Sequence, residues 1–135
     1  MIQAMKDFMT GIRSLAGYWQ VWLAGLMGLN MALPLVYIEH PEAQYTLAAA
    51  MTGGGIGLVL VKVQGFTRLL GLMHLPWVVL MFYLWNQLPL HPEMDGFGLW
   101  LRLVLLANGL SLIIDTVDVV RYIAGERQPL VEPAP

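Results

Sequence analysis

Cysteine is absent from this chain of 135 residues, and charged residues are scarce. Without cysteine, neither a disulfide framework nor a thiolate metal site can form. Only 12% of the residues are charged, compared with about 25% in typical soluble domains. The net charge of -2 is small and the seven basic residues are scattered, so nucleic acid is not an expected partner.

Hydrophobic residues make up 58% of the chain, which is more apolar surface than a soluble domain of this length can bury. A run of about 20 apolar residues spans a bilayer as a helix, because a helix satisfies its own backbone hydrogen bonds in lipid. Four such runs predict an all-α integral membrane four-helix bundle, forming one domain over residues 1–127. The helices are expected at about 19–37, 45–63, 69–90 and 97–122, with a tolerated kink at Pro76.

The two ends of the chain differ from these runs. The first apolar run is long and no small-x-small site follows it, so we expect a retained helix and not a cleaved signal peptide. Apolar residues at helical spacing over residues 2–16 indicate either a helix in the membrane interface or a frayed extension of the first span. The tail 128–135 contains three prolines and is expected to be an irregular cytoplasmic segment.

Charge asymmetry predicts the orientation. Basic residues flank the N-terminus, the connection between the second and third spans, and the C-terminus: Lys6, Arg13, Lys62, Arg68, Arg121 and Arg127. The two other connections are acidic, with Glu39, Glu42, Glu93 and Asp95, and have only Arg102 near them. The positive-inside rule therefore predicts that both termini are cytoplasmic, and we expect a bacterial inner membrane.

An internal repeat relates the two halves. Aligning Arg13 with Arg68 places Trp22 on Trp77 and Leu33-Pro34-Leu35 on Leu88-Pro89-Leu90 without a gap. This pattern favours a duplicated helical hairpin. Because both copies run in the same direction, we predict a pseudo-two-fold axis along the membrane normal.

His-Pro-Glu follows each Leu-Pro-Leu, at His40-Pro41-Glu42 and at His91-Pro92-Glu93. The imidazoles and carboxylates are suitable ligands for a divalent transition metal. Proline at a helix end and ordinary interfacial residues explain the same pattern without metal. Since no ligand-spacing motif is present, we predict no tightly bound metal, with His40, Glu42, His91 and Glu93 as the candidate ligands.

A polar face runs along the fourth helix. Asn108, Ser111, Asp115, Asp118 and Tyr122 are spaced three, four, three and four residues apart, so they share one side. A carboxylate inside a span usually faces protein or water and has a partner. His74 and Lys62 are the candidates at the depth of Asp115. Two interpretations stand: a proton or ion relay, or structural pairing in which Asp118 meets Arg121 at the surface.

Small residues recur every four positions on two helices: Ala24, Gly28 and Ala32 on the first, and Ala49, Gly53 and Gly57 on the second. Such stripes let helix backbones approach closely in lipid. They predict packing either of these two helices on each other or on another chain.

Neither a catalytic nucleophile motif nor a cofactor motif is present, so we expect no enzyme and no cofactor. Beyond size and helix count, the chain resembles no characterised family. The first functional hypothesis is an accessory or structural subunit of a membrane complex, or a homo-oligomer, with the bilayer and other membrane proteins as partners. The second is a small carrier or channel that uses the polar face of the fourth helix. The third is an outward metal site on the His-Pro-Glu loops.

Overall fold

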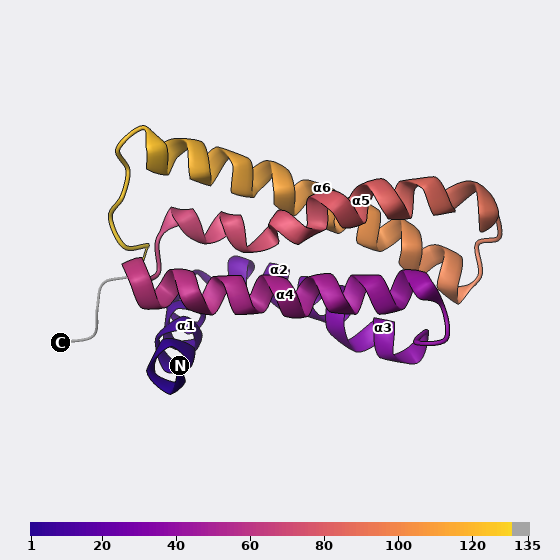
Figure 1. The fold of residues 1–135 in the computed structure, drawn as a ribbon, viewed down its shortest axis with the longest axis horizontal. Coiled ribbons are helices and arrows are strands. Elements are labelled where there is room, and N and C mark those ends of the chain that lie inside the picture. The colour runs from indigo at the N-terminus through magenta and orange to yellow at the C-terminus, as the bar shows by residue number, and fades with distance from the viewer. Residues whose placement is uncertain (131–135) are drawn as a thin grey trace.

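The computed structural model describes residues 1–130, and this part of the chain is helical with no strand. Four segments are long and apolar enough to cross a membrane: Gly17–Val36, Pro41–Gln64, Arg68–Leu90 and Gly96–Ile123. We call them the first to fourth spans. They lie alongside one another along the length of the molecule (Figure 1). The predicted all-α four-helix bundle is confirmed.

Two of the spans are continuous helices, α4 (Pro41–Gln64) and α6 (Gly96–Ile123). The first span consists of α2 (Gly17–Met27), the π-helical turn η1 (Gly28–Ala32) and the short α3 (Leu33–Val36). The third span consists of the 3₁₀ segment η2 (Arg68–His74), α5 (Leu75–Gln87) and the 3₁₀ turn η3 (Leu88–Leu90).

Local signals explain where the helices begin and end. Helix α4 begins at Pro41, four residues before the start expected from hydropathy, because proline is well suited to the first helical position. It ends at Gln64, because the next residue, Gly65, has a φ of 77° that suits glycine and stops the helix. Helix α6 is capped by Asp95, whose side chain accepts a hydrogen bond of 2.8 Å from the Gly98 N–H.

Proline also explains the change of winding in the third span. Pro76 has no N–H to bond the carbonyl of Leu72, and its ring clashes with an α-helical carbonyl four residues before it. The Leu72 carbonyl instead accepts the Leu75 N–H, which is the tighter i to i+3 bond. The kink expected at Pro76 is therefore a change from 3₁₀ to α winding.

The interior of the bundle is packed mainly between α5, α6 and parts of the first span. Leu84, Leu101 and Val104 are fully buried, and Trp77 and Trp100 are nearly so. Large apolar side chains such as Val79 and Phe82 lie on the outside. This outer apolar surface matches the lipid environment for which the four spans are long enough.

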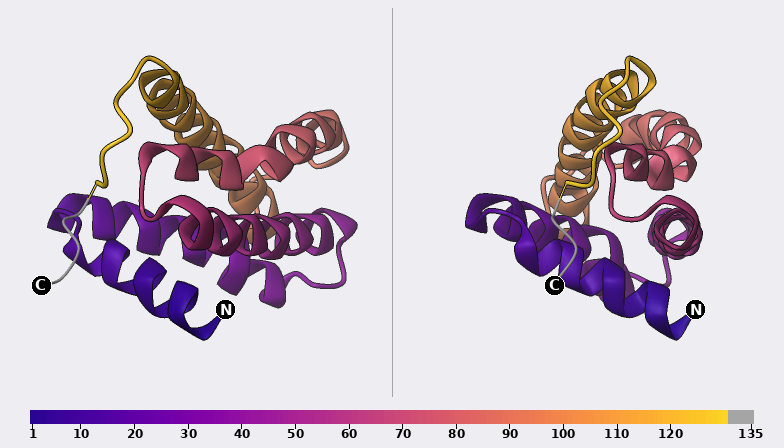
Figure 2. Two further views of the ribbon diagram at one scale, coloured as in Figure 1. Left: turned by 60° about the vertical axis from the view of Figure 1, so that its left-hand side comes forward. Right: turned by 90° about the vertical axis from the view of Figure 1, so that its left-hand side faces the viewer.

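A separate helix, α1 (Ile2–Ser14), precedes the first span. The chain turns at Leu15 and Ala16, which have extended backbone angles, and α2 starts afterwards at Gly17. In Figure 2, α1 runs across the end of the bundle instead of continuing α2. Residues 2–14 are thus not an extension of the first span.

The predicted irregular tail 128–135 lies partly outside the described residues. Up to residue 130 it is not helical, and the Leu130 N–H donates to the Phe66 carbonyl over 2.9 Å.

The pseudo-two-fold axis between the two halves stays a prediction. The halves differ in winding, because the first span has a π turn that the third lacks, and the third span has 3₁₀ segments that the first lacks. Any symmetry between them is therefore approximate at the level of the backbone.

Candidate functional site

The polar face of α6 points into the bundle. Asn108 and Ser111 are buried, and Asp115, Asp118 and Tyr122 each have a polar partner on another element. The partners of this face come from the first, second and third spans. The face therefore forms a series of polar contacts at successive depths along the interior.

The deepest contact joins α6 to the first span. The Asn30 and Asn108 side chains donate to each other through two reciprocal hydrogen bonds of 2.8 Å. Asn30 is 2% exposed and Asn108 is fully buried. A buried amide is costly without a partner. The pair therefore favours one register between these two helices.

The π-helical turn places Asn30 in this position. Pro34 lacks the N–H that would bond the Asn30 carbonyl in an α-helix. The Leu33 N–H donates to the carbonyl of Gly28, five residues before it, and not to that of Leu29. The carbonyl of Leu29 is thereby left without its usual partner. It accepts the indole N–H of Trp100 from α6 over 2.9 Å. Proline, asparagine and tryptophan together fix the distorted turn.

The next contact along α6, toward its C-terminal end, is a histidine–carboxylate pair. Nδ1 of His74 lies 2.7 Å from Oδ2 of Asp115, and both side chains are mostly buried. The His74 ring also stacks on Trp77 with 4.0 Å between ring centroids. Gly71 allows the close approach, since a Cβ there would lie 3.0 Å from the Asp115 side chain. One proton can be shared between these two groups, which is the chemistry that a relay requires.

Ionic contacts end the series. Arg68 at the start of the third span pairs with Asp118 and also lies 3.4 Å from Glu126. Glu126 accepts a hydrogen bond from Arg121, which holds the pKa of its carboxyl below the usual range. The structural interpretation of the sequence pairs Asp118 with Arg121, but in the structure Asp118 pairs with Arg68 of η2, and Arg121 pairs with Glu126.

Lys62, the other candidate partner for Asp115, does not pair with it. Its side chain is exposed, and it makes no ion pair among residues 1–130. The polar neighbour on α4 is Gln64, whose Oε1 accepts the Tyr122 hydroxyl over 3.0 Å. Of the two candidate partners that the sequence offers for Asp115, the structure thus brings His74 to it and not Lys62.

The two His-Pro-Glu copies meet at the opposite end, but unequally. Nε2 of His91 lies 2.9 Å from Oε1 of Glu42, which is buried in the first turn of α4. His40 stacks on Phe97 instead, with 3.9 Å between ring centroids, and Glu93 is exposed. Within residues 1–130, no three candidate ligands are grouped closely enough to hold a metal ion. The contact between His91 and Glu42 instead connects the second span to the loop before α6.

The small-residue stripe on α4 faces the third span. A Cβ at Gly53 would lie 2.5 Å from the Met73 carbonyl oxygen, and one at Gly57 would lie 3.1 Å from the Met73 side chain. Ala49 packs beside the central core. The 3₁₀ segment η2 thus lies directly on this stripe, which is a neighbour that the sequence did not indicate.

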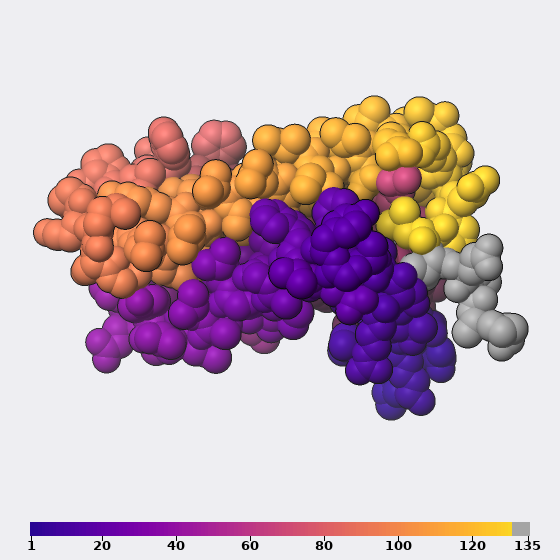
Figure 3. Space-filling model, turned by 180° about the vertical axis from the view of Figure 1, so that it is seen from behind, coloured from indigo at the N-terminus to yellow at the C-terminus, as the bar shows by residue number. Residues whose placement is uncertain are grey.

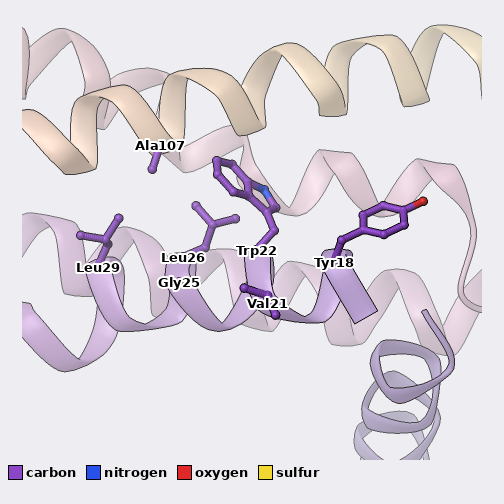
Figure 4. A pocket seen from close by; sticks show the side chains of 7 residues that line it. All are labelled: Tyr18, Val21, Trp22, Gly25, Leu26, Leu29 and Ala107. Atoms are coloured by element: carbon purple, nitrogen blue, oxygen red, sulfur yellow. The ribbon is translucent and has the colours of Figure 1, made fainter. Parts of the chain in front are cut away.

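The stripe on the first span remains open. Ala24 and Ala32 are exposed, and a Cβ at Gly28 would meet nothing within 4 Å. Two apolar hollows lie beside it. One of about 240 Å³ lies between Trp22, Leu26 and Ala107 of α6, as Figure 4 shows. The other, of about 340 Å³, is lined by Gly28, Ala32 and the neighbouring Leu47 of α4, among others.

Sequence reasoning missed several of these side chains. Asn30 is the main omission, although an asparagine in an uncharged run four residues before a proline is a recognisable signal. The charge asymmetry of the sequence uses Arg68 only to predict the membrane orientation. Helical spacing does not indicate a function for Gln64. Hydropathy leaves Glu42 in a loop, because it starts the second helix too late.

Comparison with known protein families, curated proteins and solved structures finds no match to this chain.

Proposed function

We propose that this protein is a non-catalytic structural membrane protein that assembles through its first span. The interior of the bundle favours such a role, because the amide, histidine and arginine contacts along α6 each join it to another span of the same chain. Paired groups of this kind hold helices in register. The observation that carries the proposal is the open small-residue stripe of the first span, where Gly28 and Ala32 themselves line an apolar hollow.

The occupant that fits this stripe best is a second copy of the chain, related by a two-fold axis along the membrane normal. Such an axis brings the two first spans together in parallel, the geometry in which small residues four apart pack closely. The span contains no charged residue, so two copies meet without like-charge repulsion. An accessory role beside a different membrane subunit would use the same stripe.

Cysteine cross-linking tests this assembly without interference, because the chain has no native cysteine. We expect Gly28→Cys to form a disulfide-linked dimer in native membranes, since the two stripes bring position 28 near its symmetry mate. Gly54→Cys is the matched control, because it is also a helical glycine with nothing within 4 Å. Equal cross-linking at both positions, or none at position 28, would reject a two-fold contact at this stripe.

We further propose that both termini face the cytoplasm of a bacterial inner membrane. The asymmetry of basic residues supports this orientation. In intact cells, a membrane-impermeant thiol reagent should label the Glu93→Cys variant and leave the Asp7→Cys variant unlabelled. The opposite labelling pattern would reverse the assignment.

A small ion or proton carrier is the second candidate, and the His74–Asp115 pair favours it. A histidine–carboxylate pair inside a span, with the histidine at the end of a seven-residue 3₁₀ segment, is a combination found at functional sites. The Asn30–Asn108 pair counts against a continuous path, because two reciprocally bonded amides do not exchange protons readily.

A further inference from the structure

Helix α1 has one side that packs on the bundle. Ala4 and Gly11 are buried, and a Cβ at Gly11 would collide with the ring of Phe66. Phe8 completes this side, with its ring centroid 6.1 Å from that of Phe66. The three positions on α1 are spaced four and three apart, so they share one face of the helix.

A second side is apolar and exposed. Ile2, Met5 and Met9 are spaced three and four apart, and they are 78%, 49% and 41% exposed. At 100° per residue, the bundle side, this apolar side and the polar residues Gln3, Asp7, Thr10 and Ser14 lie on three different sides of the helix, about a third of a turn apart. An exposed apolar side that the bundle leaves uncovered marks a surface for contact with a membrane or another protein.

The third feature is a pair of cations. Lys6 and Arg13 are seven residues apart, and they border the apolar side away from the bundle. Neither makes an ion pair within residues 1–130, whereas Arg68 and Arg121 both do. The only acid on the helix, Asp7, accepts a bond from Gln3. The exposed edge of α1 is therefore positively charged.

The placement of α1 indicates what covers it. In Figure 1 it is seen almost end-on at one end of the spans, which run across the view. Figure 3 shows it projecting from the body of the molecule. If the spans cross the bilayer, a helix that runs across their end lies along the membrane surface, near the headgroups.

We propose that α1 binds the surface of an anionic bilayer. Ile2, Met5 and Met9 insert among the upper acyl chains, while Lys6 and Arg13 contact lipid phosphates. The third side of the helix, which is polar, faces water. This division matches that of interfacial amphipathic helices, whose binding combines apolar insertion with attraction to anionic lipid. Phe66 fixes the rotation of the helix so that the apolar side faces the membrane.

The test uses the full chain in proteoliposomes, with a single engineered cysteine carrying an environment-sensitive fluorophore. We compare Met9→Cys on the apolar side with its neighbour Thr10→Cys on the polar side. A nitroxide near the top of the lipid acyl chain should quench the probe at position 9 more strongly. A water-soluble nickel chelate should quench the probe at position 10 more strongly. Equal quenching of both probes by both reagents would overturn the surface location.

Lipid class is tested with the same probe at position 9. Nitroxide-labelled phosphatidylglycerol should quench it more than labelled phosphatidylcholine at equal mole fraction, by up to about fivefold for each contacting cation. The double change Lys6→Gln with Arg13→Gln should abolish this preference. Lys62→Gln, an exposed cation at the same end but outside α1, is the control and should preserve it. Equal quenching by the two lipids in the unmodified chain would overturn the anionic-lipid assignment.

Discussion

Gly53→Leu should prevent the second and third spans from packing and should strongly destabilise the bundle. The new Cβ would lie 2.5 Å from the carbonyl oxygen of Met73, which is backbone and cannot rotate away. One span must then move, at a cost of about 1–3 kcal/mol or more, as for other overpacked sites. Thermal unfolding in detergent, followed by circular dichroism, measures the loss.

Gly54→Leu is the control for this change. It introduces the same side chain one residue along the same helix, where nothing lies within 4 Å. Its unfolding temperature should stay close to that of the unmodified chain. If both variants unfold at the same temperature, Gly53 does not mark a close contact between the spans.

Replacing Asp115 tests whether its pair with His74 stabilises the fold. Asp115→Leu leaves the imidazole of His74 without its partner in a mostly buried position. The expected destabilisation is about 1–3 kcal/mol, the usual cost of an unpaired buried polar group. Asp115→Asn should keep the fold, because an amide oxygen still accepts a hydrogen bond from Nδ1. Chemical unfolding of both variants in the same detergent provides the comparison.

The Asp115→Asn variant also decides between the two functional candidates. An amide cannot take up the shared proton, so a relay through this pair would lose its flux. Proteoliposomes loaded with a pH-sensitive dye measure proton entry under an imposed gradient. The structural proposal predicts the same rate for Asp115→Asn and the unmodified chain. A flux in the unmodified chain that disappears in the variant would favour the carrier instead.

The fold was predictable because hydropathy and backbone hydrogen bonding leave few alternatives in lipid. Four apolar runs joined by short connections predict four helices, whatever the details of their side chains. The inward direction of the α6 polar face was also predictable. Asn108, Asp115 and Asp118 share a side, and a lipid-facing side would add their desolvation costs.

The partners along that face were harder to predict, because they depend on how each backbone winds. Whether residues near a proline form α, 3₁₀ or π turns is decided by small energy differences and by neighbouring side chains. The Trp100 indole that donates to the π turn comes from another helix. The same is true of Gly53 and Gly57, on which η2 packs. Periodicity within one span therefore cannot indicate that Asn30 meets Asn108.

The same limit applies to the small-residue stripes. Both have the spacing that favours close packing, yet only the one containing Gly53 is covered by the chain itself. The stripe containing Gly28 remains open, and this difference is the basis of the proposed assembly.

Native mass spectrometry of the full chain, released from its membrane in mild detergent, tests that assembly most directly. The chain has a mass of 15.0 kDa. We predict a species of twice this mass, which Gly28→Leu converts to monomer while Gly54→Leu does not. A monomer from the unmodified chain, or a stoichiometric complex with a different protein, would contradict the two-fold assembly through the first span.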